Sequence, residues 1–409
     1  MTHIDSTSFL VIVVAAAVAG ILRTAVERRL IIPVVVIELV LGILIGPQVA
    51  GLASVDQFTD FFGNLGLAML FFFAGYEIDF ERIRGVPLRL GIASWVLSLG
   101  LAYGIGGLLA AAGVVLSLLY TGSAMSTTAM GTLIPILSDS GELKTKFGTH
   151  LLAVGAVGEF GPIVLVTVFL TTDHPLGEAF LLIAFVAAAV LTGVLAVRSV
   201  WKGWPALERS LETSSQLAVR LMVVLVFSLV ALAAQLGLDV LLGGFVAGLI
   251  TRVALRGHEV QAFESKATAL GYGFLIPFFF ITSGMKFDAT ALINDPKGAT
   301  RVALFLVLFL VVRGAPLLLL YRRRMQVRDR FALGFFASTQ LPMVVAITTL
   351  AVAKHHMRSV TAAALVAAGI LSTTIYPIVA VRLRGDRYDP LTPEEIDELD
   401  SSPSSAIVA

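Results

Sequence analysis

A single acidic side chain stands in the middle of an apolar, glycine-rich stretch. Glu159 lies between Gly158 and Phe160, far from the next charged residue on either side, and Pro162 follows, freeing the Gly158 carbonyl because proline has no N–H. An ionised side chain at mid-bilayer costs about 2.5–3.5 kcal/mol on insertion scales. Burial favours the protonated carboxyl and an arriving cation the ionised one, so Glu159 can trade a proton for a cation. The alternative is a structural Glu neutralised by an arginine.

A basic side chain occupies a comparable position later in the chain. Arg313, in the run Val312-Arg313-Gly314, is the one basic residue near the middle of any predicted span. It keeps its proton, so it must pair with a carboxylate or with the negative C-terminal end of an interrupted helix. Either partner would place Arg313 beside the transport site and not in it, with a structural or a mechanistic role.

Two polar patches interrupt otherwise apolar runs. Ser126, Thr127 and Thr128 lie in one, and Gln340 precedes Pro342 in the other. Non-helical backbone at membrane depth is tolerated only where it is buried in protein or lines a watery cavity, and paired interruptions in two halves of a chain indicate a transport site. The alternative is that the hydroxyls bond back to their own helix. We predict that these residues supply oxygen ligands near Glu159.

Glu38 is a further candidate inside the membrane. It follows the apolar run from Pro33 to Ile37 and lies about half a span from the predicted cytoplasmic end. It either lines a funnel that leads to the site or forms a hydrogen bond across a helix interface.

The elements that must position these residues are membrane-spanning helices. Of 409 residues, 57% are hydrophobic and 14% charged, and the mean hydropathy is +0.92, whereas soluble chains carry about 25% charged residues. Apolar windows of helical length recur from residue 8 to residue 381. They predict an all-α polytopic membrane protein with about 13 transmembrane helices, arranged as two six-span repeats around a linking seventh span.

The positive charges indicate an orientation in the cell membrane. With an odd number of spans, one set of alternate loops holds most lysines and arginines, and the other holds only Lys286, Lys297, Arg301, Lys354 and Arg358. This predicts an N-terminus outside and a C-terminus in the cytoplasm. We expect a transmembrane domain over residues 1–385 and an acidic, Ser-rich disordered tail over 386–409, too short for a soluble regulatory domain.

The composition excludes several classes of chemistry. Basic and acidic residues number 29 and 28, which leaves no basic face for nucleic acid. The chain has no cysteine, so thiol nucleophiles, thiolate metal sites and disulfides are excluded, and no histidine pair has metal-ligand spacing within a span. Nothing in the sequence predicts an enzyme or a cofactor.

Several motifs occur in order over about residues 30–380: the run from Pro33 to Pro47, the run from Leu65 to Asp79, Ser126-Thr127-Thr128-Ala129, Gly243 to Leu249 and Pro277 to Met285. Together they resemble the monovalent cation:proton antiporter superfamily. The similarity is greatest to its Kef-type and bacterial sodium:proton exchanger branch, membrane domain only.

The resemblance implies a fold and a mechanism. It implies a homodimer in which a core moves against a dimerisation domain, with inverted repeats whose discontinuous helices cross at the ion. The ion-binding Asp of the family falls on Glu159, and its Lys or Arg of the eleventh span falls on Arg313. The polar residue that usually precedes the family's Asp is Gly158 here, which is a departure from the pattern.

These observations predict a secondary active antiporter that exchanges sodium or potassium for protons by alternating access. Glu159 would hold the proton and the monovalent cation in turn, with Ser126, Thr127, Thr128 and Gln340 completing an oxygen shell. One carboxylate serving both ions predicts electroneutral exchange. The alternatives are a sodium-coupled organic-anion carrier of the same plan and a gated potassium channel or transport-dead sensor, although the chain has no selectivity-filter loop.

Overall fold

The computed structural model describes residues 5–26, 33–78, 80–165, 184–185, 187–188, 191–192, 216–236, 240–254 and 259–385. Every regular element within these ranges is helical, which confirms the predicted all-α class. The chain forms two compact units. Unit 1 comprises Met1–Ile78 and Ile163–Gly298, and unit 2 comprises Asp79–Pro162 and Ala299–Ala409. The predicted tail over residues 386–409 lies outside the described residues.

The described helices make this a multi-pass membrane protein. Eight of them are long and apolar enough to cross a bilayer, and one bent pair makes a ninth candidate. Two shorter apolar helices and a second interrupted pair fall in further predicted windows, whereas the window over residues 178–197 lies largely outside the described part of the chain. The number of thirteen spans therefore stays a prediction.

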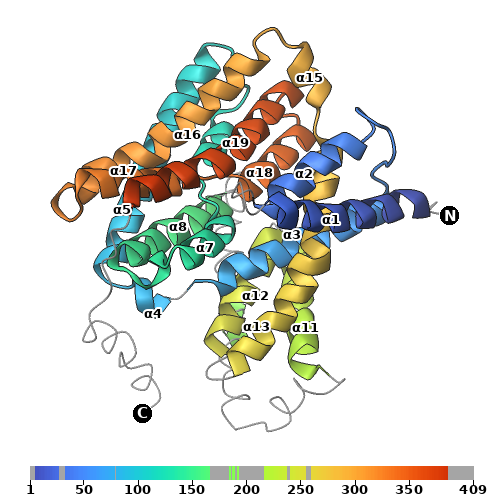
Figure 1. The fold of residues 1–409 in the computed structure, drawn as a ribbon, viewed down its shortest axis with the longest axis horizontal. Coiled ribbons are helices and arrows are strands. Elements are labelled where there is room, and N and C mark those ends of the chain that lie inside the picture. Colours follow the sequence, from blue (N-terminus) through green and yellow to red (C-terminus); the bar gives the residue numbers. More distant parts are fainter. Residues whose placement is uncertain are drawn as a thin grey trace. The chain divides into compact units, whose positions relative to one another are not determined.

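Unit 1 is a bundle in which α3 packs against α12 and α14, and α2 against α14 (Figure 1). Its helices are α1 (Ser6–Val26), α2 (Val34–Ile45), α3 (Gln57–Tyr76), α11 (Leu217–Gln235), α12 (Val240–Ala254), α13 (Glu259–Leu270), α14 (Ile276–Lys286) and α15 (Ala289–Asn294), with a π-helical turn, η3 (Gly271–Leu275), before α14. Glycines set the closest approach: a Cβ on Gly42 of α2 would lie 2.2 Å from the Ile281 carbonyl oxygen of α14.

Unit 2 contains both interrupted spans. Its helices are α4 (Phe80–Ile83), α5 (Val86–Ala111), α6 (Leu118–Met125), α7 (Met130–Asp139), α8 (Lys146–Leu165), α16 (Gly298–Leu320), α17 (Val327–Ala337), α18 (Pro342–Ala353) and α19 (Ser359–Arg384), with 3₁₀ turns η1 (Glu142–Lys144) and η4 (Tyr321–Arg323). The α17 helix packs along α19, and α17 and α18 form one span bent by 42° (Figure 1).

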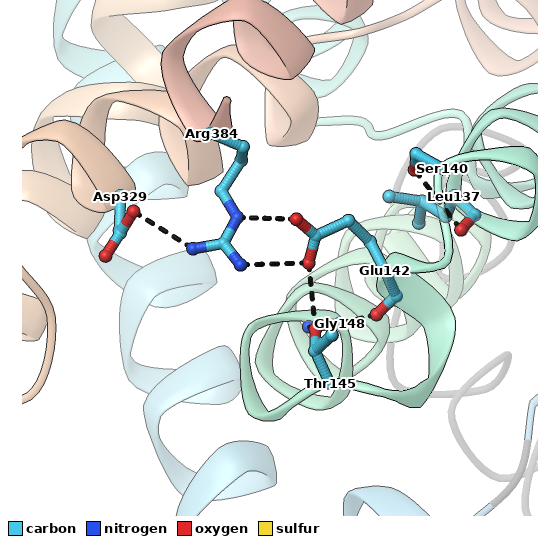
Figure 2. Close-up of polar contacts among 7 residues, drawn as sticks. All are labelled: Leu137, Ser140, Glu142, Thr145, Gly148, Asp329 and Arg384. Atoms are coloured by element: carbon cyan, nitrogen blue, oxygen red, sulfur yellow. Dashed lines mark hydrogen bonds and ion pairs between the residues drawn. The ribbon is translucent and has the colours of Figure 1, made fainter. Parts of the chain in front are cut away.

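A buried ion cluster ties the ends of three elements of unit 2 together (Figure 2). Arg384 of α19 donates to both carboxylate oxygens of Glu142 in η1, at 2.7 and 3.0 Å, and to Asp329 of α17 at 3.0 Å. Its guanidinium carbon lies 4.3 Å from the centre of the Phe147 ring. The side chains of Arg384 and Glu142 are 5% and 8% exposed, so water screens this pair little. Thr145 donates a further hydrogen bond to Glu142.

We expect Glu142→Gln to destabilise the protein strongly. Removing one carboxylate from a buried ion cluster costs up to about 3–5 kcal/mol, although Asp329 still pairs with Arg384 in the variant. The matched control is Asp60→Asn in unit 1, because the Asp60–Lys286 pair is 42% and 41% exposed and should contribute less than about 1 kcal/mol. Thermal unfolding of both variants in detergent measures the difference. Equal shifts in melting temperature would show that the buried cluster contributes no more to stability than the exposed Asp60–Lys286 pair.

Candidate functional site

The two interrupted spans of unit 2 meet at their breaks. Four residues separate α6 from α7, and four separate α17 from α18. The Ala129 N–H in the first break donates to the Thr339 carbonyl in the second at 2.8 Å. The Gln340 side-chain amide donates to the Met125 carbonyl at the end of α6 at 2.9 Å. Non-helical backbone at this depth is thus satisfied by protein groups from the other break.

Glu159 belongs to α8, and its side chain contacts the N-terminus of α7. Its side chain is buried, and Oε1 accepts a hydrogen bond from the N–H of Met130, the first residue of α7, at 3.2 Å. The N-terminus of a helix carries partial positive charge and unpaired N–H groups, so it stabilises the ionised carboxylate. Burial acts in the opposite direction, because it removes the water that would hydrate an ionised carboxylate.

The residue before Glu159 contributes its backbone. Pro162 lies inside α8 and has no N–H, so the Gly158 carbonyl has no helical donor, as the sequence predicts. That carbonyl accepts from the Thr128 N–H at 3.1 Å. The break after α6 is therefore joined to α8 directly beside Glu159.

Arg313 of α16 is fully buried and lies at the C-terminal end of α17. Nε and Nη2 donate to the Thr128 hydroxyl at 3.1 and 2.7 Å, and Nε also reaches the Ala337 carbonyl, the last of α17, at 3.4 Å. Val154 O and Ser98 Oγ accept from the two Nη atoms at 3.3 and 3.5 Å. The sequence allowed either a carboxylate or the C-terminal end of an interrupted helix as the partner of Arg313. In the structure Arg313 contacts the C-terminal end of α17, whose partial charge is negative.

The Thr128 hydroxyl is saturated by these contacts. It donates to the Ala337 carbonyl at 2.7 Å and accepts twice from Arg313. A hydroxyl has one donor and two acceptor positions, so this oxygen has no further position for an ion.

The other polar candidates keep acceptor capacity. The Ser126 and Thr127 hydroxyls donate to the carbonyls of Ser123 and Ala124 at 2.9 and 3.2 Å, which is the back-bonding considered from the sequence. Gln340 is fully buried, and its Oε1 has no hydrogen-bond partner among the described residues. The bond from its Nε2 fixes the orientation of that free oxygen.

Three glycines at intervals of three let neighbouring side chains press against α8. A Cβ on Gly158 would lie 2.5 Å from Arg313 Nη2 and 2.6 Å from Thr128 Oγ1. Cβ atoms on Gly155 and Gly161 would clash with the side chains of Met130 and Trp95. The space of the polar residue expected at position 158 is thus occupied by the Arg313 guanidinium and Thr128.

The structure brings six of the seven candidates together in unit 2: Glu159, Ser126, Thr127, Thr128, Gln340 and Arg313. Glu38 belongs to α2 of unit 1, where it is 3% exposed and its Oε2 has no hydrogen-bond partner among the described residues.

Sequence reasoning missed the contribution of α5. Its Ser98 accepts from Arg313, and its Trp95 donates to the Ser126 carbonyl at 3.2 Å. The signal was the row of small buried residues Gly91, Ser94, Ser98, Ala102 and Gly106, which marks the face that packs on the interrupted span.

Comparisons with known proteins agree on one group. The family model described as "Sodium/hydrogen exchanger, transmembrane" matches residues 13–383. The putative Na(+)/H(+) antiporter YjbQ of Bacillus subtilis is 28% identical over 404 residues, covering 94% of this chain and 64% of the relative. The Na(+)/H(+)-K(+) antiporter GerN of Bacillus cereus is 27% identical over 62% of this chain and 65% of its own length. The chain thus spans less than two thirds of each of these relatives.

A solved structure shares the fold. The sodium proton antiporter MjNhaP1 from Methanocaldococcus jannaschii superposes with a TM-score of 0.62 at 14% identity, over 93% of this chain and 99% of that one.

We expect Gly158→Ala to destabilise the protein, although alanine is the better helix former. The new Cβ would displace the buried guanidinium or Thr128, and such overpacking costs about 1–3 kcal/mol. Gly104→Ala in α5 is the control, because nothing lies within 4 Å of its Cβ position and the change should be neutral or stabilising by up to about 1 kcal/mol. Thermal unfolding would contradict the packing account if both substitutions raised the melting temperature.

Proposed function

This chain belongs to the transmembrane sodium/hydrogen exchanger family, and we propose that it is a secondary active antiporter exchanging sodium or potassium for protons by alternating access. The match over residues 13–383 confirms the resemblance noted in the sequence. The family is one of transporters and not of enzymes. The organic-anion carrier and the potassium channel gain no support from the named relatives.

The position of Glu159 at the N-terminus of α7 is the observation that carries the proposal. The hydrogen bond from Met130 stabilises the ionised carboxylate, and the burial of Glu159 in unit 2 makes its ionised form costly. A proton or a monovalent cation offsets that charge equally well. The two ions therefore compete for one site, which is the condition for obligatory exchange.

Oxygen atoms from both breaks complete the proposed shell. Hard cations prefer oxygen ligands, and the available ones are the Glu159 carboxylate, the hydroxyls of Ser126 and Thr127, and Gln340 Oε1. Thr128 enters through its carbonyl, since its hydroxyl is saturated. Arg313 stays outside the shell and compensates the negative end of α17.

The proposal also covers the extent of the domain, its assembly and its orientation in the membrane. Residues 1–385 form the antiporter domain, in which Glu38 lines a funnel, and two copies assemble as a homodimer. The N-terminus lies outside and the C-terminus in the cytoplasm, as the positive charges predict. The relative GerN, whose name combines sodium and potassium, supports keeping both cations as substrates.

Glu159→Gln should fold and lose exchange, because an amide neither titrates nor balances the charge of an ion. Glu159→Asp should retain part of the activity with altered ion preference. The measurement is collapse of a pH gradient in proteoliposomes on adding sodium, potassium or lithium. Cation-driven proton flux in the Gln variant would overturn the assignment of Glu159.

Exchange should be electroneutral. One proton on Glu159 is traded for one monovalent cation, while Arg313 stays charged throughout, so no net charge moves. Only net charge couples to the roughly 2.3 kcal/mol per 100 mV of membrane potential. We expect sodium-driven proton flux in vesicles clamped with valinomycin to be the same at all potentials. A voltage-dependent flux would require a second titrating group.

A further inference from the structure

One aromatic side chain of α5 contacts the end of the broken helix α6. The indole N–H of Trp95 donates to the carbonyl of Ser126 at 3.2 Å. Ser126 is the C-cap residue that follows α6, so its carbonyl lacks the helical donor that a continuous span would supply. Trp95 thus supplies the hydrogen-bond donor that the Ser126 carbonyl lacks because of the break in the helix.

The same side chain also contacts the helix that carries Glu159. A Cβ on Gly161 would lie 2.4 Å from Cζ2 and 2.5 Å from Cε2 of Trp95, so the indole occupies the space that this glycine leaves. Gly161 lies two residues after Glu159 in α8. Trp95 therefore fixes the end of α6 relative to the turn of α8 that holds the carboxylate.

The backbone around Ser126 shows what this contact controls. The last carbonyl of α6 and the carbonyl of its C-cap residue both have side-chain donors: Met125 O accepts from Gln340, and Ser126 O accepts from Trp95. These two hydrogen bonds hold both carbonyl groups in fixed orientations. Ser126 and its neighbours in the break are the groups that we propose as cation ligands, so the indole sets where those ligands lie.

We propose that Trp95 is a positioning residue of the cation site, whose N–H and ring together set cation affinity and selectivity. The inference rests on the proposed exchange at Glu159. The Ser126 carbonyl takes the one N–H of Trp95, so in this proposal Trp95 is no ion ligand and acts through that carbonyl and the Gly161 turn.

The test is Trp95→Phe, compared with a matched control on the same helix. Phenylalanine keeps an aromatic ring and loses the N–H. Tyr103 of α5 makes an analogous contact one turn earlier on α6: its hydroxyl lies 3.1 Å from Ser123 Oγ, and its ring covers Gly122. Tyr103→Phe therefore removes an aromatic hydrogen bond from α5 to α6 without touching the break.

The readout is sodium-, lithium- and potassium-driven proton flux in proteoliposomes. We expect Trp95→Phe to raise the apparent KM for the cation about five- to tenfold, as the loss of one hydrogen bond does, with a changed preference among the three ions and little change in turnover. Tyr103→Phe should leave KM and ion preference unchanged. If the two variants have the same KM and ion preference and differ only in stability, Trp95 is a structural residue and the proposal is wrong.

A second variant keeps the inference testable if Trp95→Phe folds poorly. Gly161→Ala pushes the indole away from the other side and should raise KM by a similar factor. In the double variant the smaller Phe ring leaves room for the new Cβ, so the two effects should not add. Additive effects would contradict the shared role. Absence of exchange in the unsubstituted protein would instead refute the proposed function itself.

Discussion

Two helices broken inside the membrane leave backbone groups that lipid cannot satisfy, and the site is built from the way in which the protein satisfies them. Unsatisfied N–H and C=O groups cost several kcal/mol each in hydrocarbon. Here the Ala129 N–H pairs with Thr339, and the Gly158 carbonyl, freed by Pro162, pairs with Thr128. The breaks are thereby held in one arrangement, with the α7 N-terminus presented to Glu159.

The same breaks provide an electrostatic pattern. The N-terminus of α7 receives a carboxylate from Glu159, and the C-terminus of α17 receives a guanidinium from Arg313. Each formal charge thus meets a helix end of opposite partial charge. In the proposed cycle the carboxylate exchanges its proton, whereas the guanidinium remains charged. The proposal therefore assigns exchange to Glu159 and a supporting role to Arg313.

Much of the site could be predicted from the sequence, because intramembrane charges and helix-breaking patches are rare and costly. Glu159, Arg313 and the two patches follow from that cost alone. The partner of Arg313 did not follow, since a carboxylate and a helix end satisfy it equally well. The reason why position 158 is a glycine could not be predicted either. It depends on the packing of Arg313 and Thr128, which occupy the space that a side chain at this position would need. Trp95 carried no signal, since a tryptophan within an apolar span is ordinary until its N–H is seen to meet the Ser126 carbonyl. The buried pair of Arg384 and Glu142 joins residues 242 positions apart, which no local pattern indicates.

The central claim is that one carboxylate holds the proton and the cation in turn. Calorimetric titration of the purified protein with sodium, in buffers of different ionisation enthalpy, counts the protons released for each cation bound. The account predicts release that approaches one proton per sodium at acidic pH, falls as the pH rises, and is absent in Glu159→Gln. Sodium binding with no proton release at any pH, or the same release from the Gln variant, would contradict it.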